Sequence, residues 1–113
     1  MTVALTEVRD ILKRYRREKQ AEAIAKLIHL RTSDAAGFEQ MITSDDAWSG
    51  VHALWEVSLY EDAAHPRDAV KEDTRRFRDC FIRLIVGMEF EGLHHDRAET
   101  VMKTFITWNK LGR

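Results

Sequence analysis

Residues 67–91, which read RDAVKEDTRRFRDCFIRLIVGMEFE, decide the expected fold of this 113-residue chain. Their core-type side chains recur at alternating steps of four and three residues, the period of one helix face: Val70, Thr74, Phe77, Phe81, Leu84 and Met88. Six turns of helix span about 35 Å at the usual rise per residue. Pro66 suits the start of such a helix, because the first turn needs no N–H from it, and Gly92 suits the end. The stretch therefore predicts one long helix.

The remainder of the chain carries the same helical period in shorter pieces. Apolar residues at spacings of three and four predict helices over residues 3–17, from residue 20 to Leu30, around Phe38–Ile42 and over residues 96–111. The run of residues 32–34, Thr-Ser-Asp, is typical of a helix cap. These segments extend the helical prediction to both ends of the chain.

The middle of the chain is harder to assign. Residues 43–50 are the most loop-like stretch, because Thr, Ser, Asp and Gly dominate them. Residues 51–60 predict a further short helix, with a strand as the competing interpretation because Val57 and Leu59 alternate with other residues. Helices of this number joined by short loops predict an all-α fold, a single-domain bundle of five or six helices over residues 1–113.

Composition limits the class of protein. The chain is 44% hydrophobic and 33% charged, which is enough apolar material for a folded core. Its one cysteine excludes an internal disulfide framework and a multi-cysteine metal site, and favours a reducing, cytoplasmic location. We expect no membrane association, because no run of 18 apolar residues exists. Glu7 and Asp10 interrupt the first residues, which therefore do not resemble a secretory signal.

The net charge of −1 hides an uneven distribution along the chain. Residues 1–32 carry +4, residues 33–66 carry −7 without a single Lys or Arg, and residues 67–113 carry +2. Asymmetry of this kind bears on association rather than on fold. Two interpretations stay open: the acidic middle faces the basic ends inside the folded domain, or it forms a surface for a basic partner protein.

The second interpretation gives a set of candidate partner-binding residues, all within or beside the acidic stretch: Asp34, Glu39, Asp45, Asp46, Trp48, Glu56, Glu61 and Asp62. Aromatic side chains among carboxylates are typical of a protein-binding hot spot aimed at a basic partner. Trp48 fits either an exposed anchor or the core. Trp55, beside Leu54 and Leu59, fits the core.

Signatures of catalysis are mostly absent. The chain holds no glycine-rich phosphate loop, no Gly-x-Ser-x-Gly elbow and no His-Glu-x-x-His, so we predict neither enzymatic activity nor a cofactor. His52 and Glu56 would share a face of a helix, and His94 and His95 form a second cluster that could meet them at one metal ion. Adjacent histidines before a helix also serve as caps, and we therefore expect no bound metal.

For the basic run of residues 13–19 and for Cys80, we favour a structural role over a functional one. The basic run of residues 13–19 could contact nucleic-acid phosphates, but Glu18 lies within it and the acidic stretch that follows would repel a polyanion. We therefore do not expect a nucleic-acid partner. Cys80 lies on the apolar stripe of the long helix, where a thiol is buried, protonated and inert.

One stretch carries a resemblance to known proteins. Residues 47–59, AWSGVHALWEVSL, resemble the central segment of small all-helical bacterial proteins, several of which act as immunity proteins beside secreted toxins. In that group a Gly/Ser turn opens a short helix, and a long helix closes the domain. This chain holds one glycine at the turn where the group's Gly-rich version holds more, and no functional residue is carried over.

Charge and resemblance together predict a non-enzymatic binding protein. The resemblance implies an immunity protein that neutralises a cognate toxin, and the acidic stretch would supply a surface complementary to a cationic cleft. The first alternative is a small regulatory or nucleic-acid-associated protein that uses the basic run of residues 13–19. The second is a metal-dependent enzyme built on His52, Glu56, His94 and His95. The oligomeric state stays open.

Overall fold

The computed structural model describes residues 1–113 and contains no β-strand. It has six α-helices and one 3-10 turn, in the order α1 (Thr2–Arg14), α2 (Glu18–Ser33), α3 (Ala35–Ile42), α4 (Asp45–Trp48), η1 (Leu59–Glu61), α5 (Arg67–Phe90) and α6 (Asp96–Leu111). The prediction of an all-α bundle is thereby confirmed. None of these helices combines the length and the apolar character needed to cross a lipid bilayer.

Helix α5 is the central element, as its sequence predicts. All six residues of the predicted stripe are buried, and Phe81 and Leu84 have no exposed surface at all. Pro66 directly precedes the helix. At the other end Gly92 adopts a left-handed φ of 76°, and the Leu93 N–H donates to the Met88 carbonyl at 2.8 Å. This is the glycine-dependent helix stop that the sequence predicts.

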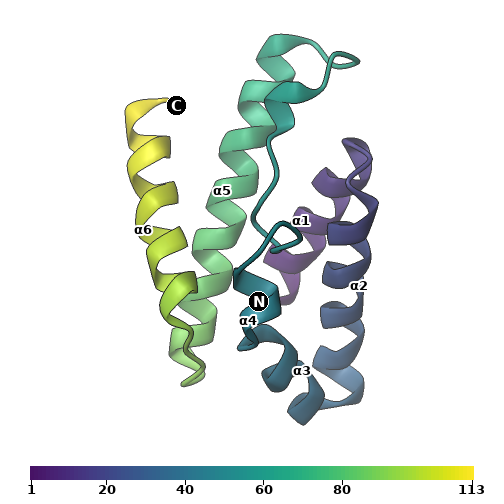
Figure 1. Ribbon diagram of the computed structural model, residues 1–113, viewed down its shortest axis with the longest axis vertical. Helices are drawn as coiled ribbons and strands as arrows, with labels where there is room; N and C mark the ends of the chain where they lie inside the picture. The colour runs from purple at the N-terminus through teal and green to yellow at the C-terminus, as the bar shows by residue number, and fades with distance from the viewer.

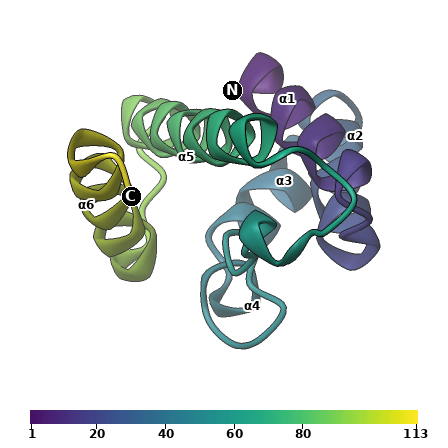
Figure 2. The ribbon, with the colours of Figure 1, turned by 90° about the horizontal axis from the view of Figure 1, so that it is seen from above.

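The other elements surround α5 on three sides. Figure 2 shows α6 on one side of α5 and the pair of α1 and α2 on the opposite side, with α3, α4 and the following loop below. The helices enclose one hydrophobic cluster that includes Leu5 and Leu12 from α1, Ile24 from α2 and Phe38 from α3. The long axis of the molecule measures 40 Å and runs along α5 (Figure 1).

The turn between α1 and α2 lies a little earlier than predicted. Helix α1 ends at Arg14, because Arg16 adopts a left-handed φ of 58°, which interrupts the helical backbone. Helix α2 then begins at Glu18. The predicted cap is confirmed at Asp34, whose carboxylate accepts a hydrogen bond from the Gly37 N–H at 3.0 Å.

The prediction for residues 51–60 is wrong. These residues form neither a helix nor a strand apart from the start of the 3-10 turn η1. Gly50 has a φ of 90°, and the Leu54 N–H donates back to the Ala47 carbonyl at 2.9 Å, so the chain folds over α4 instead of winding into a new helix. Leu54 and Leu59 still reach the core from this irregular backbone, which is why the apolar pattern resembles that of a helix.

Candidate functional site

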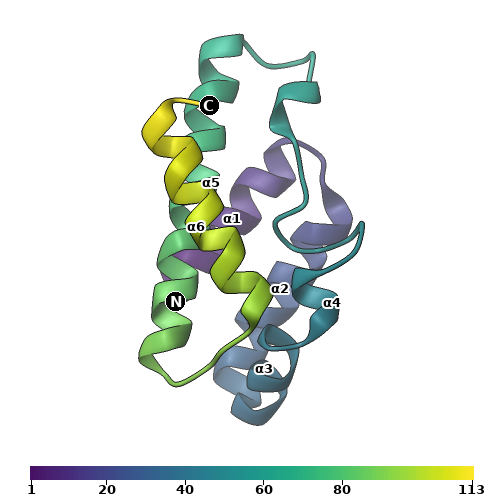
Figure 3. The same cartoon turned by 60° about the vertical axis from the view of Figure 1, so that its left-hand side comes forward.

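The acidic segment, residues 34–62, lies along one side of the molecule. Figure 3 shows it on the right, from α3 at the bottom through α4 to the loop that leads to the start of α5. Six of its seven carboxylate residues are exposed and Asp62 is half-buried. The segment contains no Lys or Arg, so no cation on the segment itself offsets these charges.

Few of these carboxylates are neutralised by the basic ends of the chain. Glu61 lies 3.7 Å from the Arg17 guanidinium, and this is the only ion pair between the acidic segment and a Lys or Arg. Asp45 and Asp62 pair with histidines, at 2.7 and 2.6 Å. Asp34 caps α3, whereas three residues have neither a side-chain hydrogen bond nor an ion pair: Glu39, Asp46 and Glu56. Internal pairing with Lys and Arg therefore accounts for one carboxylate of the seven.

Trp48 is not an exposed anchor, so this part of the predicted site is wrong. Its side chain is 0% exposed and packs edge-on against Phe81 at a centroid distance of 6.2 Å. The indole N–H donates to the Ile42 carbonyl at 2.6 Å, which satisfies a carbonyl at the end of α3. The exposed apolar side chains of the acidic segment are instead Val51 and Tyr60.

The histidines do not converge on a metal site. His52 and Glu56 lie on the irregular loop, so the helical spacing that made them a pair is absent. His95 caps α6, since its Nδ1 accepts from the Arg97 N–H at 3.1 Å and its Nε2 lies 2.7 Å from Asp45. No group of three or more potential ligands that could hold a metal ion is present. His94 pairs only with Asp96, two residues further along the chain, at 2.7 Å, and this raises the pKa of the His94 imidazole.

Three side chains of the basic run, residues 13–19, make hydrogen bonds to other parts of the fold. Arg14 donates to both carboxylate oxygens of the buried Asp73 at 2.9 Å, and the Tyr15 hydroxyl donates to the same carboxylate at 2.7 Å. Burial, together with this hydrogen bond, raises the pKa of Tyr15 to about 12. Arg17 donates to the Ser58 carbonyl at 3.0 Å. These contacts tie the α1–α2 turn to α5 and to the acidic segment.

Cys80 lies in the core, beside Glu7. The thiol is buried and donates to a carboxylate oxygen of Glu7 at 3.1 Å. Burial raises the pKa of Cys80 to about 12, with a further increase from Glu7, so the thiolate is scarce at neutral pH. The structure therefore agrees with the core position that the sequence predicts.

A groove that the sequence does not predict lies beside the acidic segment. It encloses about 820 Å³ between residues 51–61, α5, α6 and the α1–α2 turn. Five aromatic side chains contribute to its lining: Trp55, Tyr60, Phe77, Phe105 and Trp108. Four separate parts of the chain build this groove, and the only hint in the sequence is the spacing of three residues between Phe105 and Trp108.

Comparison with models of known protein families, with curated proteins and with solved structures finds no match to this chain. Its function is therefore inferred from the residues and their geometry.

Proposed function

We propose that this protein is a non-enzymatic binding protein whose acidic segment, residues 34–62, docks on a basic surface of a partner protein. The observation that supports the proposal is that internal neutralisation is limited: one of the seven carboxylates pairs with an arginine, two pair with histidines, and six of the seven are exposed. Glu39, Asp46 and Glu56 are exposed and have no partner, so their charges are available to another protein.

The physics of such a surface favours fast and selective association. Unpaired carboxylates of one sign create a field that attracts a cationic partner before contact, over about 8–10 Å at physiological salt. Charge complementarity also rejects partners of the wrong sign. The exposed Val51 and Tyr60 can supply the apolar contact that charge alone does not, and tyrosine is among the residues enriched at binding hot spots.

Within this class we propose that the partner is a toxin and that binding neutralises it. Two observations support this role: the charge of the segment, which suits a cationic cleft, and the resemblance of residues 47–59 to small helical immunity proteins. The resemblance rests on residues 47–59 and on the long helix α5 that follows them. The short helix that the resemblance implies after Gly50 is absent.

The proposal is tested by affinity capture from the native organism followed by mass spectrometry. The informative variant replaces the three carboxylates without partners, Glu39→Lys, Asp46→Lys and Glu56→Lys. A matched control reverses three exposed carboxylates outside the segment, each also without an ion pair, by the substitutions Glu22→Lys, Glu72→Lys and Glu89→Lys. Both variants change the net charge equally.

We expect the wild type and the control to capture the same protein and the first variant to lose it. The toxin role further requires that the captured protein arrests growth when it is expressed alone, and that co-expression of this chain restores growth. Equal capture by both variants, or loss on Lys13→Gln, Arg16→Gln and Lys19→Gln instead, would move the binding face to the basic turn and overturn the proposal.

A further inference from the structure

His95 joins the start of α6 to the acidic segment. Its ring Nε2 lies 2.7 Å from a carboxylate oxygen of Asp45 on α4, and no other hydrogen bond or ion pair connects the acidic segment to the start of α6. The ring also stacks on the buried Trp48, at a centroid distance of 6.5 Å and an interplanar angle of 29°. Only 13% of the His95 side chain is exposed. The imidazole is therefore largely enclosed between α4 and α6.

The partners of the two ring nitrogens determine which of them carries a proton. Nδ1 of His95 lies 3.1 Å from the backbone N–H of Arg97, which can only donate, so Nδ1 must accept and carries no proton. Nε2 faces the carboxylate of Asp45, so it carries the proton and donates. The neutral ring therefore satisfies both contacts, and in this form it is the N-cap of α6.

A protonated ring cannot make the same pair of contacts. Both nitrogens of an imidazolium donate, so the Nδ1–H of His95 would face the Arg97 N–H, and α6 would lose its side-chain cap. The positive end of the helix dipole also opposes a cation at this position. Histidine is the side chain that ordinarily changes charge between about pH 5 and 8. Mild acidification is therefore enough to change these contacts.

The charged groups next to His95 act in opposite directions. The hollow beside the ring is lined by polar side chains only: Asp45, His94, Asp96, Arg97 and Thr100. Asp96 is paired with His94 at 2.7 Å, so the charge of each is offset by the other when His94 is protonated. Asp45 favours the protonated form of His95, whereas Arg97 and the helix dipole favour the neutral form.

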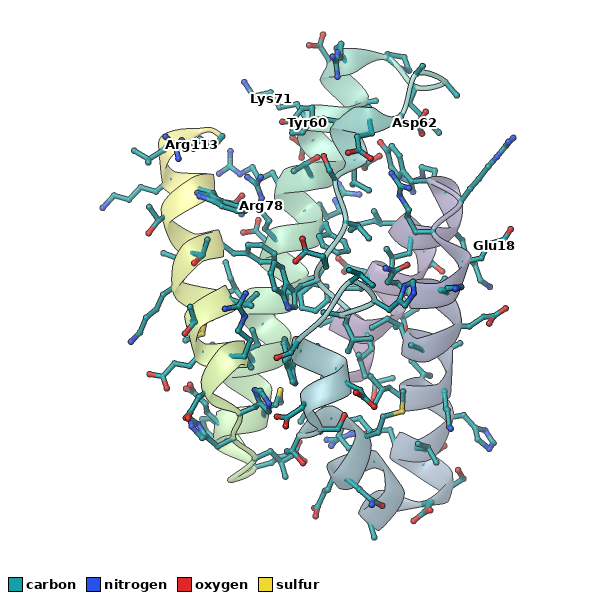
Figure 4. All side chains as sticks on the ribbon, in the orientation of Figure 1. Glu18, Tyr60, Asp62, Lys71, Arg78 and Arg113 are labelled. Carbon is teal, nitrogen blue, oxygen red and sulfur yellow. The ribbon has the colours of Figure 1, made fainter.

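The remaining charges of α6 act weakly on His95. Glu99, one turn further along the helix, lies 3.4 Å from the ammonium group of Lys103, which offsets its charge. Figure 4 shows Arg113 at the opposite end of α6. A helix of 16 residues is about 24 Å long, well beyond the screening length of about 8 Å at physiological salt. Asp45 and Arg97 therefore dominate the balance at His95.

The capped turn of α6 has a second contact with the acidic segment. The Arg97 guanidinium lies 5.3 Å from the centre of the Trp55 ring. Trp55 in turn donates its indole N–H to the Trp48 carbonyl at 2.8 Å, and Trp48 stacks on His95. A movement of the first turn of α6 therefore reaches the loop after α4 as well as α4 itself.

We propose that His95 is a pH-sensitive switch between α6 and the acidic segment. In its neutral form the ring caps α6 and donates to Asp45. In its protonated form it no longer accepts from the Arg97 N–H, so the first turn of α6 opens and its contact with Trp55 loosens. The rest of the bundle stays folded. The switch is a property of the fold and does not depend on the partner proposed above.

NMR spectroscopy of the full chain tests the switch at the ring and at the backbone. At about pH 8 the nitrogen signals of the His95 ring should show a proton on Nε2 and none on Nδ1. As the pH falls to about 5, the Arg97 amide signal should shift with the same midpoint as the ring. Hydrogen exchange of residues 97–99, corrected for the intrinsic effect of pH, should accelerate about fivefold, the equilibrium factor for a typical cap.

Three variants make the result specific. His95→Asn keeps a preferred cap residue that does not titrate, so exchange in the first turn of α6 should become independent of pH. His94→Asn is the matched control, because it removes the adjacent exposed histidine, which caps nothing, and it should keep the pH dependence. Asp45→Asn removes the carboxylate that favours the protonated ring, so it should move the midpoint to lower pH.

Two results on the wild type would overturn the proposal even if a variant fails to fold. The first is a proton on Nδ1 of His95 at about pH 8, which would exclude the capping form. The second is an Arg97 amide whose signal and exchange do not follow the titration of the ring. The same pH dependence in His95→Asn as in the wild type would also overturn it.

Discussion

Helix α5 and residues 43–62 both bury large side chains, but they hold them in different ways. In α5 the backbone satisfies its own hydrogen bonds, and the buried residues follow the helical period. In residues 43–62 much of the backbone is irregular, and Trp48, Leu54 and Leu59 reach the core from unrelated local conformations. The comparison shows that the spacing of apolar residues predicts the structure only where the backbone forms a regular helix and satisfies its own hydrogen bonds.

Much of residues 43–62 lacks regular helical hydrogen bonds, and two indole N–H groups supply hydrogen bonds there instead. Trp48 donates to the Ile42 carbonyl and Trp55 donates to the Trp48 carbonyl, so the two side chains connect the end of α3, α4 and the loop in series. A segment held by few such bonds opens locally at a lower free energy than a long packed helix. We therefore expect residues 43–62, which carry most of the proposed partner surface, to open at a lower free energy than α5.

The largest effect is expected in the helical region. Phe81→Ala removes a fully buried ring of α5, and we expect the free energy of unfolding to fall by about 3–5 kcal/mol, from the lost burial and the cavity left behind. Phe90→Ala, at a position of the same helix that is 92% exposed, is the matched control. Urea denaturation measures both. An unchanged midpoint for Phe81→Ala would contradict the assigned core.

A smaller and local effect is expected in the irregular segment. Trp48→Phe keeps an aromatic ring but removes the indole donor, which leaves the Ile42 carbonyl short of a partner and should lower the free energy of unfolding by about 1–3 kcal/mol. Hydrogen exchange should accelerate in residues 43–62 more than in α5. Uniform acceleration across both regions would show that the segment does not open separately.

The pH dependence tests the contact between the α1–α2 turn and α5. The pKa of Tyr15 is raised to about 12 in the folded protein, above its ordinary value of 10.0. Stability from this group is therefore complete below pH 10 and declines as the pH rises towards 12, because the unfolded chain ionises first. Urea midpoints measured across this range should fall in the wild type, and less in Tyr15→Phe. Parallel curves for the two proteins would refute the role of Tyr15.

The smallest effect on stability is expected at the acidic surface. Asp45 is 93% exposed and Asp46 has no partner, so the double substitution Asp45→Lys and Asp46→Lys should change the free energy of unfolding by less than about 1 kcal/mol. Thermal melting followed by circular dichroism measures the change. A larger loss would mean that these carboxylates stabilise the fold, which would contradict a role limited to partner binding.

The sequence predicts the helical region well and the site only in part. The bounds of α6 match the prediction, and the stripe of α5 is buried as expected, because both helices repeat one pattern over many turns. The position of Trp48 could not be predicted, since its burial depends on a carbonyl of α3 and a ring of α5. The groove escaped prediction for the same reason, because residues distant in sequence build it.

The association rate of the captured partner as a function of salt tests the central claim most directly. We expect the rate constant of the wild type to fall steeply between low and physiological ionic strength, as screening shortens the field of the acidic segment to about 8 Å. Glu39→Lys, Asp46→Lys and Glu56→Lys together should slow association and flatten the salt dependence, whereas the Glu22, Glu72 and Glu89 reversal should do neither. Equal rates and equal salt dependence for the wild type and the first variant would contradict the claim that residues 34–62 attract the partner.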